Sequence, residues 1–559
     1  MLILLYFQRL LRYNIVMVND IKLATTEDVY RQNADLLLQV KLLTEQNTYL
    51  SEQLLILRQH LFGSKSEQKI AIAFDDQLSL FNEAEAESNP IAPEPEFEEV
   101  TYKRKKSKGK REIDLSGLPV ERIVYELSEN ERICPVCGGP LHACKHDVLR
   151  RELTVIPAQY KVTEHVETVY TCRECEENNI KTPMVKSEVP APVISGSGVA
   201  SPSLVAHIAH QKYTLGLPLY RQEQEFKRNN INISRQNMAN WIIYTAEHWL
   251  VQIYLAMKVI LMLADILHAD ETTVQVLHED GKPAESKSYM WLYRTGCDTD
   301  RSIVLFDYQP NRRHENAKAF LDGFSGYLHS DGYQAYDNLP SDVIPVGCWA
   351  HVRRKFADIL KSLPDYNKPG SLAMCAVDFC DKLFELEREY EKNLSSSSSS
   401  SEDNFKARYE ARLEKSKPLM GEFFAWAESV YGRNILATPK SAMGRTLAYA
   451  LNQRTQLENV LLDGRFELSN NRAERSVKPF AIGRKNWLFS NTERGADSSA
   501  MFYSVIETAK ENGLKPFEYL NFIFKTAPNL DLAHNPDLVK KLLPWNAPPE
   551  CRNDNQILS

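Results

Sequence analysis

The spacing of apolar residues changes several times along the chain, and each spacing predicts a different element. Between residues 25 and 63, leucine recurs at every seventh position, at Leu36, Leu43, Leu50 and Leu57. With these leucines at heptad position d, the a positions hold Asn33, Val40, Asn47, Leu54 and Leu61. This pattern predicts a short leucine-zipper coiled coil, and Asn at two a positions favours one register, commonly a parallel dimer. The alternative is an amphipathic helix packed on its own domain.

Residues 190–260 show helical spacing. Helices are expected over residues 204–212 and 219–228, and a third begins after Ser234, a residue type that favours helix N-caps. The first turn of this third helix carries Arg235, Gln236 and Asn237, which suits a helix-turn-helix that reads DNA. A plain helical bundle that bridges two domains explains the same pattern.

Between residues 261 and 356 the pattern changes to short apolar runs of strand length. Five strands are expected, over residues 264–270, 288–294, 302–307, 326–331 and 343–349, with helices over 315–324 and from 350 onward. Three meandering strands followed by alternating helices and strands predict a mixed sheet of the ribonuclease-H type. Its first and fourth strands are neighbours, so the acids that end them, Asp270 and Asp331, are expected to meet.

The sequence after residue 356 has a mostly helical pattern. Residues 357–465 read as a charged helical insertion with a flexible serine loop at 395–401. Residues 466–515 complete the sheet domain, with Glu474 on a helix capped by Ser469 or Asn470 and a closing helix over 502–510. Residues 516–559 are expected to be a less structured tail.

Composition places the chain among ordinary globular proteins. It has 559 residues, 43% of them hydrophobic, and a formal net charge of -7. Nucleic-acid contacts must therefore come from local patches. The densest patch is at residues 103–111, within a linker over 64–115 whose earlier part is acidic and contains proline. We interpret the linker as disordered and as an arm that also touches DNA phosphates; a purely solvated linker is the alternative.

Residues 1–24 form an N-terminal extension. Its apolar run over residues 1–7 is too short to span a bilayer, and Arg9 and Arg12 follow it. No small-residue cleavage motif follows, so neither a signal peptide nor a membrane partner is expected. Met17 is as good a start of translation as Met1.

Two Cys-x-x-Cys pairs lie within residues 116–189. They are formed by Cys134, Cys137, Cys172 and Cys175. Such pairs on tight turns supply the four thiolates that Zn²⁺ accepts in a closed structural site. Rival ligands nearby are His142, Cys144 and His146, and unrelated reduced cysteines are the alternative. The predicted fold class is therefore multidomain α+β: a coiled coil, a small zinc-binding domain, and a ribonuclease-H-like α/β catalytic domain with a helical insertion.

Three carboxylates are candidates for chemistry, namely Asp270, Asp331 and Glu474. Glu474 lies among three basic residues, Arg472, Arg475 and Lys478. A lone acid among bases is usually a surface ion pair. If folding brings the three acids together, however, they form a site for two Mg²⁺ (or Mn²⁺) ions, which suits in-line attack on a phosphodiester.

Several of these motifs together resemble one known family. They lie at residues 61–66, in the two Cys-x-x-Cys pairs, and at 268–272, 330–333, 347–354, 470–475 and 483–487. In this order and over nearly the whole chain they are similar to the insertion sequence 66 family of DDE transposases. The resemblance implies Asp270, Asp331 and Glu474 as the metal-binding triad. It also implies cutting at terminal inverted repeats, joining of the freed 3′ ends to target DNA, element-encoded accessory proteins, and a bacterial cytoplasmic location at the nucleoid.

Other residues around the triad have open roles. Many enzymes of the wider DDE class place a base seven residues after the catalytic glutamate, where this chain has Ala481. Candidate phosphate contacts are Arg472, Arg475, Lys478, Arg484 and Lys485. Trp487 either stacks on an unpaired base or belongs to the core. His351 and Arg354 either support the metal ligands or cap a helix.

Two other functional classes remain open. A DNA-binding regulator with an inactive nuclease fold would use the zipper, the zinc module and the helix-turn-helix, but it leaves three intact acids unexplained. A nuclease that cuts without joining is the second alternative. The zipper predicts self-association, which fits the pairing of two element ends.

Overall fold

The computed structural model describes residues 34–37, 39, 159–173, 177, 184–336, 339–395 and 401–553. The chain divides into two compact units, Ser66–Val189 and the combination of Met1–Lys65 with Pro190–Ser559. Residues 34–37 and 39 are helical, and Leu36 is 56% exposed. The other positions of the predicted zipper, the linker over 64–115 and the basic run at 103–111 lie outside the described residues.

The described part of the first unit contains a small antiparallel ladder. It pairs β1 (Val169–Tyr170) with β2 (Val185–Lys186), so that Val169 lies opposite Lys186. Beside the ladder, the Lys186 Nζ atom lies 2.8 Å from Glu167 Oε2. Strand β1 lies between the two Cys-x-x-Cys pairs along the chain.

The second unit is built on a mixed sheet. Its strands are β3 (Ile266–His278), β4 (Lys287–Thr295), β5 (Val304–Gln309), β6 (Gly326–His329), β7 (Val343–Val346) and β8 (Ser490–Thr492). The order is β5-β4-β3-β6-β7, with β8 on the far part of β3. The pairs β3–β4 and β4–β5 are antiparallel. The pairs β3–β6, β6–β7 and β3–β8 are parallel. This matches the predicted meander, with the first and fourth strands side by side.

Strand β3 corrects one prediction. The sequence placed Asp270 at the end of its strand, but β3 continues for eight further residues to His278. The alternation persists beyond Asp270, because Val274 and Val276 are buried on the core side while Gln275 is exposed. Asp270 therefore lies within a paired strand, opposite Leu292 of β4, and this fixes its backbone on that side.

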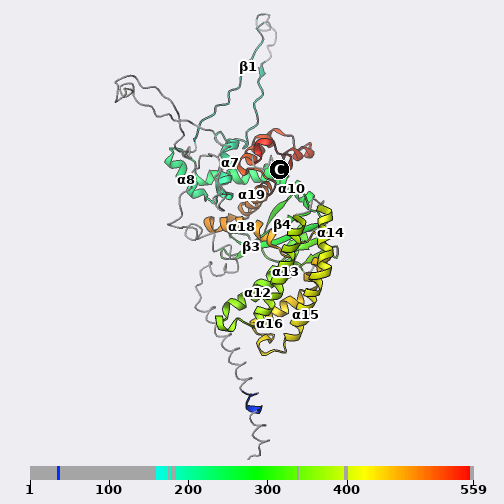
Figure 1. The fold of residues 1–559 in the computed structure, drawn as a ribbon. Coiled ribbons are helices and arrows are strands. Elements are labelled where there is room, and N and C mark those ends of the chain that lie inside the picture. The colour runs from blue at the N-terminus through cyan, green and yellow to red at the C-terminus, as the bar shows by residue number, and fades with distance from the viewer. Residues whose placement is uncertain are drawn as a thin grey trace, which may run out of the picture. The chain divides into compact units, whose positions relative to one another are not determined.

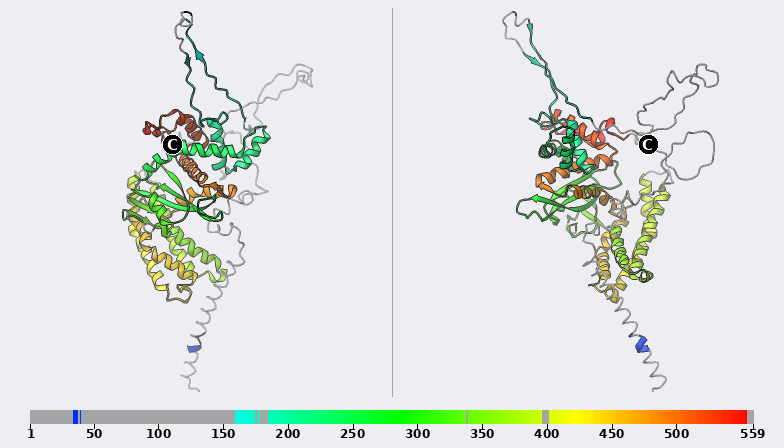
Figure 2. Two further views of the ribbon diagram at one scale, coloured as in Figure 1. Left: turned by 180° about the vertical axis from the view of Figure 1, so that it is seen from behind. Right: turned by 90° about the vertical axis from the view of Figure 1, so that its left-hand side faces the viewer.

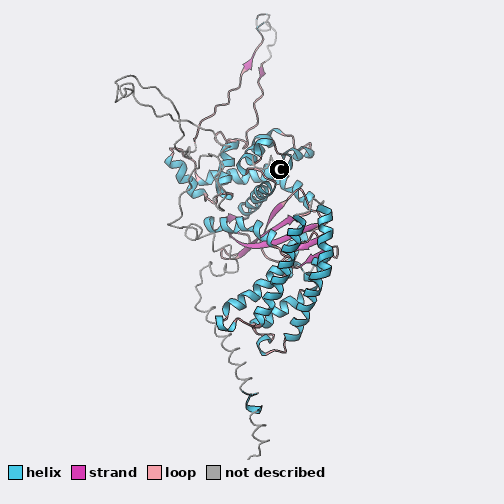
Figure 3. Cartoon of the chain, viewed as in Figure 1, coloured by secondary structure: helices cyan, strands magenta, loops and turns pink. Residues whose placement is uncertain are grey.

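Helices surround the sheet (Figure 3). Before it come α7 (Pro202–Tyr213), α8 (Leu219–Arg228), α9 (Arg235–Thr245) and α10 (Val251–Leu261). Within and after it come α11 (His314–Phe320), α12 (Trp349–Ser362), α13 (Leu372–Ser395), α14 (Ser401–Ala411), α15 (Lys417–Val430), α16 (Ala442–Asn452), α17 (Arg454–Glu458), α18 (Asn471–Trp487), α19 (Glu493–Glu511) and α20 (Pro516–Thr526). No helix in the described ranges is long and apolar enough to cross a membrane.

The two faces of the sheet belong to two hydrophobic clusters. Consecutive strand residues point to opposite faces, and accordingly Ile266 packs with one cluster and Leu267 with the other. The cluster with Ile266 is built around Trp349 and Phe423 and holds α12, α13, α15 and α16 together. The other holds α7, α10, α19 and α20. Figures 1 and 2 show these two groups of helices with the sheet between them.

Helix α19 also protects the edge strand β5. Ser504 Oγ accepts the backbone N–H of Phe306 at 2.8 Å, and Thr508 Oγ1 accepts that of Val304 at 3.0 Å. An edge strand otherwise presents unpaired backbone groups that invite pairing with another chain. The hydroxyl groups of α19 therefore take the place of a further strand.

The C-terminal segment differs from the prediction of a less structured tail. Helix α20 buries Tyr519, Leu520, Ile523 and Phe524, whose spacing of one, three and one residues marks one helical face. The hydroxyl of Tyr519 donates to the carbonyl of Leu542 at 2.6 Å. Apolar side chains on one face of α20 thus tie this segment into the core, despite the Pro-rich and Asn-rich text that follows.

Candidate active site

Strand pairing brings two of the predicted acids together. In the parallel pair of β3 and β6, His268 lies opposite His329, and their rings stack with centroids 4.9 Å apart. Asp270 follows two residues later on β3, so it lies on the same side of the sheet as the stacked histidines, and Asp331 lies two residues beyond His329, just past the end of β6. Burial and the carboxylates of Glu271, Asp331 and Glu474 raise the pKa of Asp270 well above its ordinary value. Asp331 and Glu474 therefore both lie near enough to Asp270 to disfavour its ionised form.

The two aspartates are held by backbone groups. Asp270 Oδ1 accepts the N–H of Glu271 at 2.9 Å, and Asp331 Oδ1 accepts the N–H of Tyr333 at 2.9 Å. Within the described ranges, neither aspartate forms an ion pair with a basic side chain. Two adjacent carboxylates without a protein cation are a fitting place for a divalent ion, because oxygen ligands are what Mg²⁺ prefers.

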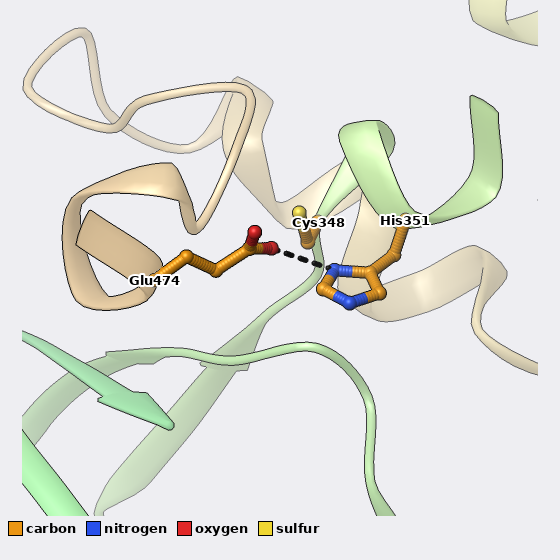
Figure 4. A group of neighbouring side chains, drawn as sticks. All are labelled: Cys348, His351 and Glu474. Atoms are coloured by element: carbon orange, nitrogen blue, oxygen red, sulfur yellow. Dashed lines mark ion pairs between the residues drawn. The ribbon is translucent and has the colours of Figure 1, made fainter. Parts of the chain in front are cut away.

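Glu474, in the first turn of α18, has a different environment. Its side chain is 8% exposed, and Arg354 Nη2 lies 3.0 Å from Oε2. His351 Nδ1 lies 3.5 Å from Oε1. Both predicted supporting residues, His351 and Arg354, therefore reach the acid from helix α12, as Figure 4 shows for His351. The protein itself supplies the positive charge beside this carboxylate.

Cys348 adds a further potential metal ligand beside Glu474 and His351. Potential ligand atoms of Cys348, His351 and Glu474 lie within 4.8 Å of one another (Figure 4). Burial raises the pKa of the Cys348 thiol to about 12, and its Sγ accepts the backbone N–H of Asn470 at 3.1 Å. A metal at this group would also have to displace Arg354. We therefore interpret Cys348 and His351 as neighbours that pack beside Glu474, while Arg354 is the residue that hydrogen-bonds it.

Glu271 is an acid that the sequence analysis did not single out. It pairs with the guanidinium of Arg312 and accepts the hydroxyl of Tyr336 at 2.8 Å. Arg312 in turn stacks over the ring of Tyr333, 3.4 Å from its centroid. Alternation along β3 sends Glu271 to the opposite side from Asp270. The signal that was available is a second charged residue inside a buried strand.

Comparison with known proteins assigns the family. The family model described as "Transposase IS66 family" matches residues 197–498, which is more than half of the chain and includes all three acids. The chain belongs to the IS66 family of transposases. Further matches are "zinc-finger binding domain of transposase IS66" at 131–176, "IS66 C-terminal element" at 504–545 and "Transposase C of IS166 homeodomain" at 49–123. The predicted resemblance is thus confirmed.

Full-length relatives occur in Sinorhizobium fredii (strain NBRC 101917 / NGR234). Uncharacterized protein y4qI is 30% identical over 90% of this chain and 89% of its own length. Uncharacterized protein y4hP is 29% identical over 88% and 87%, and Uncharacterized protein y4jD is 27% identical over 88% and 93%. The similarity therefore covers the chain almost end to end.

The IS66 zinc-finger match contains all four predicted zinc cysteines. The structure describes Cys172, which is half-buried. Cys134, Cys137 and Cys175 lie outside the described residues, as do the rival ligands His142, Cys144 and His146. The family match supports a structural zinc module over residues 131–176.

The predicted DNA-binding residues fall into two groups in this IS66 protein. Arg472 pairs with Glu467 at 2.8 Å, and Arg484 bonds the hydroxyl and carbonyl oxygens of Thr273 on β3. These two bases therefore already hold the fold together. Arg475 on α18 and Arg235 and Gln236 at the start of α9 are exposed, whereas Lys478 and Lys485 on α18 are half-buried.

The structure answers two further questions, the place of Trp487 and the capping of the helix after Ser234. Trp487 packs edge-on against Phe480, with ring centroids 5.4 Å apart, and so belongs to the core. Ser234 caps α9, since its hydroxyl accepts the N–H of Asn237 at 3.1 Å. The first turn of α9 is exposed, as an element that reads DNA requires.

Proposed function

We propose that this protein is the DNA transposase of an insertion sequence. It would cut at the ends of its element and join the freed 3′ ends to target DNA. The proposal is supported by the placement of Asp270 on β3, of Asp331 just beyond the end of the neighbouring strand β6, and of Glu474 on α18, since Asp331 and Glu474 both act on the pKa of Asp270. The strand order 5-4-3-6-7, antiparallel and then parallel, is also that expected for a ribonuclease-H-like core.

Asp270, Asp331 and Glu474 are the residues that would hold two divalent ions, Mg²⁺ or Mn²⁺. Such ions supply activation of the attacking oxygen and stabilisation of the leaving oxygen in phosphodiester chemistry. The acids themselves would provide the oxygen ligands. Burial first, and then the neighbouring carboxylates, raise the pKa of Asp270, and a bound dication would favour its ionised form. Arg354 would hold Glu474 in place before metal and DNA arrive.

The remaining predicted parts complete this proposal. Arg475, Lys478 and Lys485 on α18 would hold DNA phosphates near the acids, and Arg235 and Gln236 would contact the element end. Cys134, Cys137, Cys172 and Cys175 would bind one structural Zn²⁺. The zipper would pair two copies and thereby two element ends.

The decisive experiment uses a DNA duplex that carries the repeats flanking the gene, with Mg²⁺. Wild type is expected to cut and join it, while Glu474→Gln and Asp331→Ala bind it but do neither. Glu458→Gln, which removes a charge from a surface pair with Arg454, is the matched control and should remain active.

Each other outcome separates an alternative. Binding without cleavage by wild type would favour a DNA-binding regulator. Cleavage without joining would favour a nuclease. Full strand transfer by Asp331→Ala would contradict the assignment of the three acids.

A further inference from the structure

One fully buried residue, Asn470, connects the elements that carry the three acids. Its side-chain Nδ2 donates to the carbonyl of Ala269 at 2.7 Å, and its Oδ1 lies 2.9 Å from His268 Nδ1. Because the amide nitrogen faces a carbonyl, Oδ1 is the acceptor, and His268 therefore carries its proton on Nδ1. Ala269 directly precedes Asp270, so the side chain of Asn470 is anchored beside the first acid.

The backbone of Asn470 reaches the other two sides of the site. Its N–H donates to Cys348 Sγ at 3.1 Å, at the start of the helix that carries His351 and Arg354. Its carbonyl accepts the N–H of Glu474 at 3.2 Å. All four polar groups of Asn470 are thus used, and one of them bonds the third acid itself.

This use of Asn470 departs from what its position would normally favour. It is the N-cap residue of α18, where an Asn side chain usually accepts an N–H of the first turn, a bond whose loss typically costs about 1 kcal/mol. Here the side chain makes no such bond and turns to β3 instead. A local rule broken at a helix start is typical of a functional constraint.

Neighbouring contacts hold the same segment. His329, the stacking partner of His268, lies with Nε2 2.8 Å from the carbonyl of Glu467. The N–H of Trp349 donates to the carbonyl of Leu468 at 2.9 Å. Each acid-bearing strand therefore contributes a buried histidine, two residues before its aspartate, that fixes the approach to α18.

We propose that Asn470 is a positioning residue that sets the place of Glu474 relative to Asp270 and Asp331, with His268 as its partner on β3. The inference rests on the proposed function, since it assigns the three carboxylates to divalent ions. It predicts that loss of the Asn470 side chain weakens metal binding even where the protein stays folded and still binds DNA.

The test measures Mn²⁺ binding to the full-length protein by electron paramagnetic resonance. The fraction of bound Mn²⁺ that Asp331→Ala loses is defined as binding at the site. Asn470→Ala is expected to weaken this binding about 10- to 100-fold, as is typical when a group that orients metal ligands is removed. The matched control is Asn512→Ala. Asn512 also gives two side-chain hydrogen bonds, to the carbonyls of Ser302 and Thr508, but outside the site. It should lower thermal stability and leave Mn²⁺ affinity unchanged.

A second pair of variants guards against misfolding of Asn470→Ala. His268→Ala removes the donor to Oδ1, whereas His268→Asn keeps an amide N–H near the Nδ1 position. Mn²⁺ affinity should fall in the first and recover at least partly in the second. Wild-type affinity in folded Asn470→Ala, or equal losses in both His268 variants, would overturn the inference. Absence of site-specific Mn²⁺ binding in wild type would instead contradict the proposed function itself.

Discussion

The two aspartates and the glutamate of the candidate site are held in different ways. Asp270 and Asp331 lie in and directly after adjacent parallel strands, so the register of β3 and β6 sets their separation. Among the described residues, the hydrogen bonds to their carboxylates come from backbone N–H groups. Glu474 comes from a helix that begins 140 residues after Asp331 along the chain, at Asn471, and Arg354 and His351 lie against it.

This difference shows what each acid needs. A strand inside a sheet is fixed along its length by ladder hydrogen bonds, so an aspartate on it needs little help from side chains. A helix packed on a sheet can shift or rotate, and its acid needs cross-links from several elements. Asn470 at the start of α18 supplies some of these contacts, and Cys348, at the start of α12, and Arg354 on α12 supply others.

The largest expected effect comes from shortening the helix acid. Glu474→Asp keeps the charge but shortens the side chain by one methylene. Because α18 is held by its contacts, it cannot shift to bring the carboxylate back to its original position. A displacement on this scale typically costs about 100-fold in rate, so single-turnover cleavage at saturating DNA should fall about that much. Glu458→Asp serves as the control. Cleavage within a few-fold of wild type would mean that α18 moves freely enough to compensate.

Stability without metal should separate the two kinds of acid. In chelator, Glu474→Gln should lower the free energy of unfolding by about 1–3 kcal/mol, because Arg354 loses a charged partner in a mostly buried place. Asp270→Asn should raise it at neutral pH, because the raised pKa of Asp270 shows that its ionised form is penalised in the folded state.

The raised pKa of Asp270 also determines how the stability of the protein depends on pH. The penalty on Asp270 appears only above the pKa of an unfolded aspartate, about 4, and grows as pH rises toward the higher folded pKa. Urea unfolding should therefore give equal stabilities for wild type and Asp270→Asn near pH 3.5 and a gap at pH 7. A destabilised Asp270→Asn at pH 7 would contradict the penalty that burial and the neighbouring acids place on ionised Asp270.

The smallest effect is expected from the cation beside Glu474. Arg354→Gln removes a charge that competes with a bound dication, so Mn²⁺ affinity should rise about 5-fold, equivalent to about 1 kcal/mol. Arg353→Gln is the neighbouring control, since Arg353 pairs with Asp381 and faces away from the acids. If both variants weaken Mn²⁺ binding alike, Arg354 does not act on Glu474 as the geometry indicates.

Much of the fold was readable from local pattern. Short apolar runs predicted the strands of the sheet, and Ser234 marked the start of α9. The order of strands and helices predicted that the first and fourth strands are neighbours. Periodicity and capping depend on residues a few positions apart, so the sequence carries these signals directly. The motifs over nearly the whole chain likewise sufficed to indicate the IS66 family.

Other features were decided only by tertiary structure. The continuation of β3 beyond Asp270 depends on pairing with β4 and β8, and the order of the C-terminal segment depends on burial of one face of α20. Arg484 and Arg472, which were predicted to contact DNA, bond instead to Thr273 and Glu467. Glu271 likewise pairs with Arg312 inside the protein.

Asn470 shows the physical reason for this division. Local reasoning assigns it to capping α18, and it does occupy the N-cap. Its side chain nevertheless bonds residues 201 and 202 positions earlier. The sequence determined which residue types stand near the site, whereas long-range packing decided which hydrogen bonds they make, because such partners become neighbours only when the sheet and its helices assemble.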